Sequence, residues 1–265
     1  MKERTILVVI PVREEHRELL EEAAPGNRFV YSSIKEVSRE QVQEADIILG
    51  NVPADKIGAS KKLEWLQLNS AGADAYAGEG ILDKNTVVTT SNGAYGKTVS
   101  EHMFAMLLAM QKKLHLYRDS QNKHIWDEHG TVTSIADSTV LIFGMGDIGR
   151  HFAKMAHALG AYVIGVKKNP GNCPEYIDEP HLMKDCRELL PHADVVVSFL
   201  PSTSETRGLF NKEMFHLMKP GAFFLNGGRG DAVCTEELCE VLDEGRLAGV
   251  ALDVTKPEPL PTDHR

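Results

Sequence analysis

A glycine-rich segment at residues 144–149 has the spacing of a turn that binds phosphate groups. The segment reads GMGDIG and follows an apolar, β-like run at residues 139–143. Gly144 would allow a tight turn, Gly146 would let a phosphate approach the backbone, and Gly149 would let a helix pack on the strand. A GxGxxG string is a weak signal alone, but a place between strand and helix is the one that dinucleotide binding requires. The spacing therefore predicts a dinucleotide site, with a merely tight strand-to-helix turn as the alternative.

The segment after the turn is expected to begin an amphipathic helix near Ile148. The N–H groups of a first helical turn have no partner within the helix, so those around Asp147 and Ile148 would face the phosphates. The next strand ends in Lys167 and Lys168, about 20 residues on, where an acidic residue would bind the ribose hydroxyls of NAD. Two lysines at this place favour the 2′-phosphate of NADP, although they could also be solvated surface lysines.

Three further strings follow expected strands, at the edge of an open α/β sheet where ligands bind. They are NGGRG at residues 226–230, LDV at 252–254 with EPLP at 258–261, and NSAGAD at 69–74. Each also has a plainer interpretation as a tight turn or a surface loop that carries charges.

The elements that would position these strings alternate between strands and helices, which predicts parallel sheets covered by helices on both faces. The first part is expected to contain strands at Thr5–Ile10, Phe29–Tyr31, Ile47–Leu49, Leu66–Leu68 and Val87–Thr90, and helices at Glu14–Ala23 and Ser38–Glu44. The second part is expected to contain strands at Thr139–Phe143, Tyr162–Val166, Val195–Phe199, Ala222–Asn226 and Gly249–Val254, and helices from Ile148 to Leu159 and at Met183–Leu190, Lys212–Met218 and Thr235–Glu244. We therefore predict an α/β chain of two doubly wound parallel-sheet domains, with the boundary near Ser100.

One long apolar helix is expected from Ser100 to Tyr117, between the two parts. Its apolar residues cover nearly all of its faces, which is typical of a helix buried on several sides. The apolar stretch from Met103 to Leu114 would suit a domain connector or a subunit interface, and a homodimer is expected on this basis. Residues 119–137 are polar and irregular and would form an arm or loop.

Composition and charge exclude several classes of function. The chain has 265 residues and a net charge of −9, which argues against general nucleic-acid binding. Its beginning has no long apolar core of a signal peptide, and no apolar run approaches the roughly 18 residues of a membrane span. The four cysteines form no CxxC pair, so reduced thiols are expected and a metal site is not. These features favour a cytoplasmic protein.

Taken together, the strings resemble the D-isomer-specific 2-hydroxyacid dehydrogenase family over nearly the whole chain. Its NxxRG, LDV and EPLP elements occur in order, the SxGxD loop matches residues 70–74, and VSEH at residues 99–102 matches the start of the interdomain helix. The resemblance implies a flavodoxin-like substrate domain at residues 1–100 and an NAD(P)-binding Rossmann domain at residues 101–265.

The resemblance also implies a role for each matching residue. Arg229 would pair with the carboxylate of a 2-oxo acid and polarise its carbonyl, because a guanidinium offers donors to both oxygens. Glu258 would orient a histidine that donates the proton, and Asp253 would contact the nicotinamide carboxamide. The implied backbone contacts to the substrate carboxylate come from Ser70, Ala71 and Gly72. The remaining implied cofactor contacts are Leu200, Pro201, Thr206, Gly227 and Gly228, with Thr98 as a further candidate.

The chain departs from the family pattern at its end. The family's catalytic histidine lies in a Pro-His pair beyond the EPLP element, and the sequence stops at residue 265, before that point. His264 matches a variable position after EPLP and is not expected to replace it. We expect the C-terminal return segment and the catalytic histidine to be missing, either because the sequence is a shortened version of a longer enzyme, which is favoured, or because the natural product binds cofactor and reduces its substrate poorly.

The expected function is that of an oxidoreductase that transfers a hydride between NAD(P)H and a small 2-oxo acid, with NADP favoured over NAD. Glyoxylate, hydroxypyruvate and pyruvate are suitable substrates. Two alternatives remain: a non-catalytic, dinucleotide-binding regulatory protein, and a phosphoglycerate-type dehydrogenase. The latter would need basic residues near the Ser70 loop, for which Lys61, Lys62 and Lys97 are the candidates.

Overall fold

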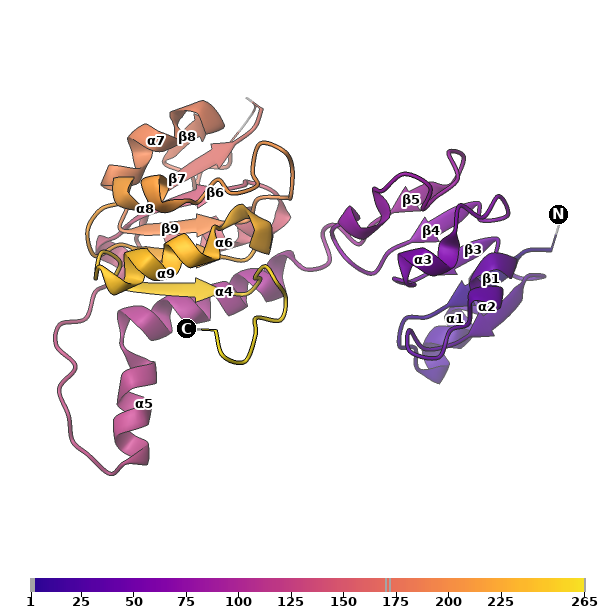
Figure 1. Cartoon of the computed structure of the whole chain (residues 1–265), viewed down its shortest axis with the longest axis horizontal. Helices are drawn as coiled ribbons and strands as arrows, with labels where there is room; N and C mark the ends of the chain where they lie inside the picture. Colours follow the sequence, from indigo (N-terminus) through magenta and orange to yellow (C-terminus); the bar gives the residue numbers. More distant parts are fainter. Residues whose placement is uncertain (1–2, 170, 172, 265) are drawn as a thin grey trace. The chain divides into compact units, whose positions relative to one another are not determined.

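The computed structural model describes residues 3–169, 171 and 173–264. The chain divides into two compact units, Met1–Ala94 and Tyr95–Arg265, each with its own parallel sheet and hydrophobic core (Figure 1). The prediction of two parallel-sheet α/β domains is confirmed. The two compact units divide between Ala94 and Tyr95, just before helix α4 (Gly96–Gln111), whereas the sequence placed the domain boundary near Ser100.

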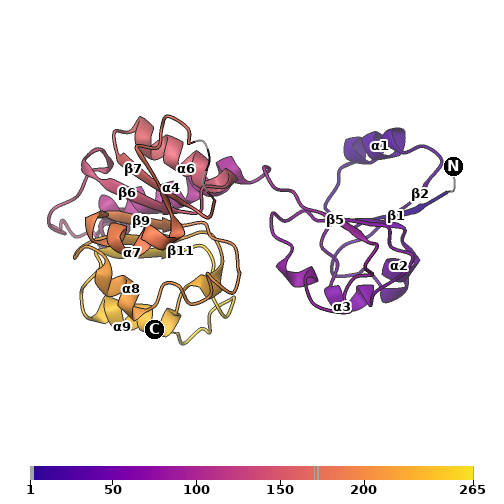
Figure 2. The same cartoon turned by 90° about the horizontal axis from the view of Figure 1, so that it is seen from above.

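The first unit has five parallel strands in the order β2-β1-β3-β4-β5, the order of flavodoxin-like sheets. Its elements are β1 (Thr5–Val8), α1 (Glu14–Ala23), β2 (Arg28–Tyr31), α2 (Arg39–Glu44), β3 (Ile47–Leu49), α3 (Ala54–Ile57), β4 (Trp65–Gln67) and β5 (Val87–Thr89). Helix α1 covers one face of the sheet, whereas α2 and α3 cover the other (Figure 2). Leu7, Ile48 and Leu66 are neighbours on one face of the sheet and are completely buried. Val8 points to the opposite face and is also completely buried, so both faces of the sheet contribute to the core.

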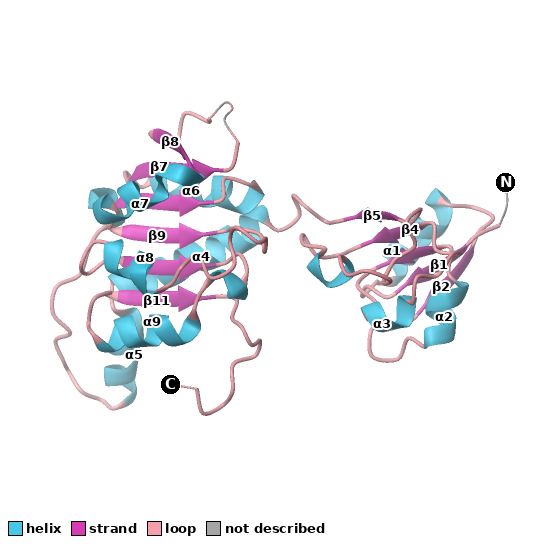
Figure 3. Ribbon diagram, turned by 45° about the horizontal axis from the view of Figure 1, so that its top comes forward, coloured by secondary structure: helices cyan, strands magenta, loops and turns pink. Residues whose placement is uncertain are grey.

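The second unit has six parallel strands in the order β11-β10-β9-β6-β7-β8 (Figure 3). Its strands are β6 (Thr139–Phe143), β7 (Tyr162–Lys167), β8 (Glu179–Leu182), β9 (Val195–Ser198), β10 (Phe223–Asn226) and β11 (Gly249–Leu252). Counted from β6, this is the 3-2-1-4-5-6 order of dinucleotide-binding sheets, with its switch point between β6 and β9. Ligands bind such sheets outside the carboxyl ends of the strands near that point.

Helices bury both faces of the second sheet. They are α4, α6 (Asp147–Ala158), α7 (Cys186–Leu189), α8 (Lys212–Leu217) and α9 (Thr235–Asp243), whereas α5 (Leu114–Asn122) projects away from the sheet (Figure 1). Successive residues of β6 point to opposite faces, so Val140 and Ile142 pack in the cluster that includes residues of α4 and α6. Leu141 and Phe143 pack in the cluster that includes residues of α7, α8 and α9. This burial on both sides explains why the strand is apolar throughout.

The prediction of a single long helix at residues 100–117 is wrong, because two helices are present. Helix α4 ends at Gln111, and α5 begins at Leu114 after Lys113, whose φ of 55° places it in the left-handed region. A residue in that conformation cannot continue an α-helix, so α5 leaves the direction of α4. Leu114 continues the helical spacing of the apolar residues across the break, so the sequence pattern did not reveal where α4 ends. The polar segment expected to be irregular from residue 119 is helical as far as Asn122.

Two other elements of the second unit differ from expectation. Strand β8 was not predicted because its four residues are mostly polar and include Pro180, which an edge strand tolerates. The helix expected at residues 183–190 is short: α7 is flanked by 3-10 turns at Met183–Asp185 and Leu190–His192. Within the described ranges, no helix is both long and apolar enough to cross a bilayer.

Candidate functional site

The turn between β6 and α6 requires glycine at two positions for steric reasons. Gly144 has a φ of +93°, and a Cβ built on it would lie 2.8 Å from the carbonyl oxygen of Phe199. A Cβ built on Gly149 would lie 2.1 Å from the carbonyl oxygen of Gly144. Gly146 differs, because a Cβ there would have no atom within 4 Å. Gly146 is therefore not needed for packing, and the open space beside its backbone suits a ligand.

A pocket of about 740 Å³ lies at this turn, and we call it the glycine-turn pocket. It is formed at the carboxyl ends of β6, β7 and β9, on the side of the sheet where the switch point lies. Seven of the predicted cofactor-binding residues line it: Gly144, Gly146, Lys167, Lys168, Leu200, Pro201 and Thr206. Residues predicted from separate strings of the sequence are thus brought together in one cavity.

Hydrogen bonds hold the far wall of the glycine-turn pocket. The buried hydroxyl of Thr206 donates to the carbonyl oxygen of Pro201 at 2.6 Å and accepts from the N–H of Thr203 at 2.9 Å. Thr206 therefore stabilises the loop after β9. The Cys186 thiol also lines the pocket, and burial raises its pKa, which keeps it neutral.

The two predicted lysines of the pocket already have partners in the protein. Lys168 forms an exposed ion pair with Glu205, with 3.0 Å between Nζ and Oε2. The Lys167 ammonium donates to the carbonyl oxygen of Gly171 at 2.5 Å and lies 3.7 Å from the Cys173 sulfur. An exposed ion pair is worth only about 0–1 kcal/mol, so an anionic ligand could compete for Lys168.

Several lining residues of the glycine-turn pocket were missed from the sequence. They are Met145, Val166, Asn169, Met183, Lys184, Cys186, Thr203, Glu205 and Leu209. Lys184 follows β8, and an unrecognised edge strand gave no reason to place it beside β7. Glu205 was overlooked because the resemblance pointed only to its neighbour Thr206.

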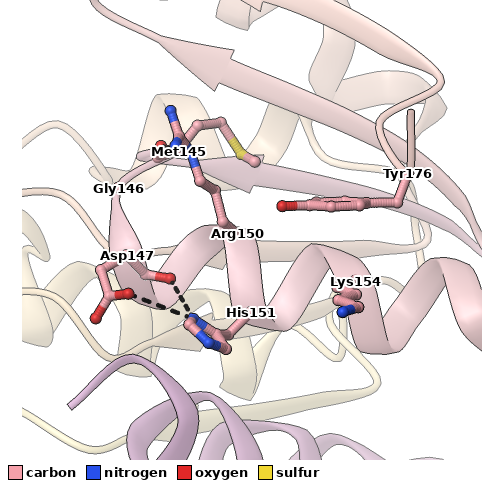
Figure 4. A pocket seen from close by; sticks show the side chains of 7 residues that line it. All are labelled: Met145, Gly146, Asp147, Arg150, His151, Lys154 and Tyr176. Carbon is pink, nitrogen blue, oxygen red and sulfur yellow. Dashed lines mark hydrogen bonds and ion pairs between the residues drawn. The ribbon is translucent and has the colours of Figure 1, made fainter. Parts of the chain in front are cut away.

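A second pocket of about 500 Å³ shares Met145 and Gly146 with the first and extends along α6 (Figure 4). Asp147, a predicted cofactor residue, lies here, and its carboxylate is 3.4 Å from Nδ1 of His151. The Asp147 carboxylate also lies against Gly96, where a built Cβ would be 2.3 Å from it. The Asp147 side chain thus already has partners within the protein. The predicted phosphate contact of Asp147 and Ile148 therefore concerns their backbone N–H groups. Ile148 follows in the first turn of α6.

Arg150 contributes a positive charge to this second pocket. Its Nε donates to the carbonyl oxygen of Met145 at 3.1 Å, so the guanidinium lies over the start of α6 rather than away from it. Lys154 and Tyr176 line the same pocket. The helix N-terminus and the Arg150 charge both favour an anion on this side of the glycine turn.

The NGGRG string packs closely behind the pocket. A Cβ on Gly227 would lie 3.0 Å from the Met103 sulfur, and one on Gly228 would lie 2.5 Å from the carbonyl oxygen of Leu200. These two glycines let β10 approach its neighbours and do not line the glycine-turn pocket. Arg229 follows, half-buried, with its Nη1 donating to the Gly228 carbonyl oxygen at 2.9 Å.

Asp253 lies at the end of the neighbouring strand β11. Its N–H donates to the Asn226 carbonyl oxygen at 3.0 Å, which ties the ends of β10 and β11 together. Its carboxylate lies 3.4 Å from Nε2 of His102 on α4, a pairing that the sequence did not predict. Thr98 is exposed in the first turn of the same helix.

Glu258 is exposed in the segment after β11. Its carboxylate accepts a hydrogen bond from the N–H of Thr255 at 3.4 Å. His264 is instead directed to α9, with 3.6 Å between its Nε2 and Oε1 of Glu236. The structure therefore does not bring His264 and Glu258 together as a pair.

In the first unit, the Ser70 loop follows β4. The Ser70 hydroxyl accepts a hydrogen bond from Nδ2 of Asn51 at 2.9 Å and donates to the Gly72 carbonyl oxygen at 2.7 Å. Across residues 3–169, 171 and 173–264, the N–H groups of Ser70, Ala71 and Gly72 have no hydrogen-bond partner. Three consecutive donors without partners can bind a carboxylate. Asn51, which also accepts from the Asn69 N–H at 3.0 Å, was missed because no pattern distinguished it.

These features fit a nicotinamide dinucleotide better than a metal ion. The open backbone at Gly146, the N-terminus of α6 and the lysines of the glycine-turn pocket are complementary to phosphates and an apolar ring. The part of the chain that the structure describes contains no cluster of three or more His, Cys, Asp or Glu residues that could hold a metal.

Comparisons with known proteins agree with this geometry. Residues 104–265 match the family model described as D-isomer specific 2-hydroxyacid dehydrogenase, NAD binding domain. A D-isomer specific 2-hydroxyacid dehydrogenase family protein from Aeromonas salmonicida is 32% identical, with a TM-score of 0.87 over 99% of this chain and 85% of that one. An NADPH-dependent glyoxylate/hydroxypyruvate reductase from Sinorhizobium meliloti, solved with NADP and sulfate, is 25% identical, with a TM-score of 0.82 over 99% and 84%.

The D-3-phosphoglycerate dehydrogenase of Methanocaldococcus jannaschii is 29% identical over 263 residues, which are 96% of this chain and 49% of that enzyme. The chain thus spans about half the length of that relative. The family model covers more than half of the chain, in the unit that contains the glycine turn. The chain therefore belongs to the D-isomer-specific 2-hydroxyacid dehydrogenase family.

Proposed function

We propose that this protein transfers a hydride between NAD(P)H and a small 2-oxo acid, forming a D-2-hydroxy acid. The observation that carries the proposal is the convergence of the predicted residues at one edge of the second sheet. Seven of them line the glycine-turn pocket after β6, β7 and β9, and Arg229 and Asp253 follow β10 and β11. We assign the first unit, Met1–Ala94, to substrate binding and the second to the cofactor.

The residues of this chain would bind and polarise the substrate. When bound, the nicotinamide would supply the hydride for a carbonyl carbon, and the resulting alkoxide oxygen would take its proton from water or from a histidine oriented by Glu258. Arg229 would bind a carboxylate and stabilise the charge that develops on the carbonyl oxygen, since its guanidinium offers several donors in one plane. The N–H groups of Ser70, Ala71 and Gly72 would bind a carboxylate without adding charge. Asp253 would accept from the nicotinamide carboxamide and is held by His102.

We propose NADP as the preferred cofactor. Lys167 and Lys168 stand at the end of β7, where NAD-binding sheets of this order place a carboxylate. The Sinorhizobium meliloti relative is an NADPH-dependent reductase. The lysines therefore favour a cofactor with an additional phosphate.

A substrate panel tests the proposed function. Oxidation of NADPH and of NADH would be followed with glyoxylate, hydroxypyruvate and pyruvate, and dinucleotide binding would be measured by calorimetry. Turnover of a 2-oxo acid, with a lower KM for NADPH, is expected. Tight binding without turnover on any acid would instead favour the regulatory function, and a strong NADH preference would contradict the NADP assignment.

The panel should also include 3-phosphoglycerate with NAD(P)⁺, because one relative is a D-3-phosphoglycerate dehydrogenase. Two of the lysines that such a substrate would need are engaged elsewhere. Lys62 donates to the Glu44 carbonyl oxygen, and its ammonium lies 3.8 Å from Asp46. Lys97 lies 4.0 Å from Glu101. Lys97 is exposed and its ion pair is weak, so only the contacts of Lys62 disfavour the phosphorylated substrate.

We propose that a second copy of the chain packs against α5 and the loop after it, which we call the arm. The apolar residues Met103 and Leu107 of α4 are completely buried within the second unit, so they are not the dimer surface. The arm instead projects from the sheet of that unit (Figure 1) and exposes large apolar side chains. They are Leu114, Leu116, Tyr117, Ile125, Trp126 and Val132. An exposed apolar surface of this kind is typical of a protein interface.

A further inference from the structure

The glycine-turn pocket contains three lysines and one glutamate, and they come from three different parts of the second unit. Lys167 ends β7 and Lys168 follows it, Lys184 lies in the 3-10 turn after β8, and Glu205 lies in the loop after β9. Strands β7 and β8 are parallel, with Lys167 opposite Leu182, so their carboxyl ends meet at the same edge. This register places Lys184 at the mouth of the pocket beside the predicted pair.

The three ammonium groups differ in what they already bind. Lys168 is paired with Glu205, with 3.0 Å between Nζ and Oε2, and Lys167 donates to Gly171. Lys184 is exposed and has neither a hydrogen bond nor an ion pair with any residue that the structure describes. Lys184 is therefore the lysine of the pocket that an anion can reach without displacing a protein group.

We propose that Lys184 and Glu205 together set the choice between NADPH and NADH. Lys184 binds the 2′-phosphate on the adenosine ribose, and Glu205 opposes it by holding Lys168 and by placing a carboxylate at the same mouth. This inference rests on the proposed dinucleotide function of the pocket, and it concerns only the phosphate that distinguishes the two cofactors.

The charges decide the direction of each effect. A phosphate monoester carries close to two negative charges at neutral pH, so it gains from each nearby ammonium and loses from each nearby carboxylate. Water and salt screen an exposed charge beside this phosphate, so each such charge contributes about 1 kcal/mol, which corresponds to about a fivefold change in affinity. NADH lacks this phosphate and should be nearly insensitive to both residues.

The test measures the dissociation constants of NADPH and NADH for the wild-type chain and for two variants by calorimetry at low salt. We expect E205Q to bind NADPH about fivefold more tightly and K184A to bind it about fivefold more weakly, with NADH changed by less than about twofold in both. Adenosine 2′,5′-bisphosphate and AMP, which differ only in the 2′-phosphate, should reproduce the same ratios.

Glu240→Gln serves as the matched control. Glu240 also pairs with a lysine, Lys212, at 2.7 Å on the surface, and it does not line the glycine-turn pocket. This variant should leave the affinities for both cofactors unchanged. Thermal unfolding of all variants checks that they remain folded.

The outcomes separate the inference from the function on which it rests. If the wild-type chain binds neither dinucleotide, the proposed function is wrong and the inference falls with it. If both cofactors bind but the NADPH to NADH ratio does not move in E205Q and K184A, only the inference is overturned. Equal changes for the two cofactors would also overturn it, since they would show a general effect on the pocket.

Discussion

The Ser70 loop after β4 and the glycine turn after β6 both stand at the carboxyl edge of a parallel sheet, but they are held by different means. The glycine turn is set by backbone sterics, because a side chain at Gly144 or Gly149 would overlap neighbouring backbone atoms. The Ser70 loop is held by the Asn51 side chain, which donates to the Ser70 hydroxyl and accepts from the Asn69 N–H. Both leave N–H groups for an anion, one at a helix N-terminus and one in an irregular loop.

This difference predicts how each region responds to mutation. A turn set by sterics fails as a whole when a side chain is added where atoms already lie. A loop held by two or three hydrogen bonds loses about 1 kcal/mol for each, and its donors remain in the chain. The second unit also adds a charged side chain, Arg229, whereas the Ser70 loop offers only neutral donors.

The largest effect is expected for Arg229→Ala. Removal of the guanidinium should lower kcat/KM for a 2-oxo acid by roughly 10²–10³-fold, because the charge that develops on the substrate oxygen loses its partner. The NADPH dissociation constant should stay within about twofold. Steady-state kinetics and calorimetry measure the two quantities, and Arg229→Lys should recover only part of the activity. Activity that survives R229A would rule out the proposed role.

Two glycine variants test whether the turn is set by sterics or by its ligand. Gly146→Ala meets no atom within 4 Å, so its unfolding temperature should match the wild type while NADPH and NADH bind about 10²-fold more weakly. Gly149→Ala should lose about 3 kcal/mol or more of stability, because its Cβ would meet backbone. Thermal unfolding and calorimetry compare them. Equal losses of stability in both variants would contradict the distinction.

The arm is tested by Trp126→Glu. Trp126 is 99% exposed in the single chain, and a buried interface tryptophan is typically worth 2 kcal/mol or more, or about 30-fold in dimer affinity. Sedimentation over a range of concentrations should show a dimer for the wild type and a shift to monomer for the variant. Val87→Glu, also at an exposed apolar residue but in the first unit, is the control. A wild-type monomer at high concentration would disprove the proposal.

A smaller effect is expected for Asn51→Ala in the first unit. Without Asn51, the Ser70 loop loses two hydrogen bonds, and the KM for the 2-oxo acid should rise about fivefold while cofactor affinity does not change. Asn85→Ala, in another loop of the same unit, should leave KM unaltered. A change in NADPH affinity without a change in KM would contradict the assignment of the Ser70 loop to substrate binding and of the glycine turn to cofactor binding.

The smallest effect concerns β8, the edge strand that carries Lys184 to the pocket. Hydrogen bonds from Tyr162 and His181 lower the pKa of Glu179 from its ordinary value of 4.5. The stability that its carboxylate contributes is therefore present above about pH 4.5 and is lost as the pH falls through the lowered pKa. Glu179→Gln should flatten the decline of the unfolding temperature between pH 5 and pH 3. An unchanged decline would show that the contact is not coupled to folding.

The local chemistry of the site could be predicted from the sequence because neighbouring residues determine it. The glycine spacing at residues 144–149 follows from the sterics of one turn, and the paired lysines after β7 follow from one strand. The alternation of strands and helices was sufficient for two parallel sheets, since the central strands are apolar and buried on both faces.

Only the tertiary structure decided which distant residues meet. Lys184 reaches the pocket through the pairing of β7 with β8, a strand too polar to be recognised, and Glu205 meets Lys168 across the sheet edge. The break at Lys113 was hidden because Leu114 kept the apolar spacing while the backbone turned. Sequence spacing reports contacts within an element, whereas the pairing of strands and the packing of helices determine those between elements. The charge balance of the glycine-turn pocket is therefore a property of the fold.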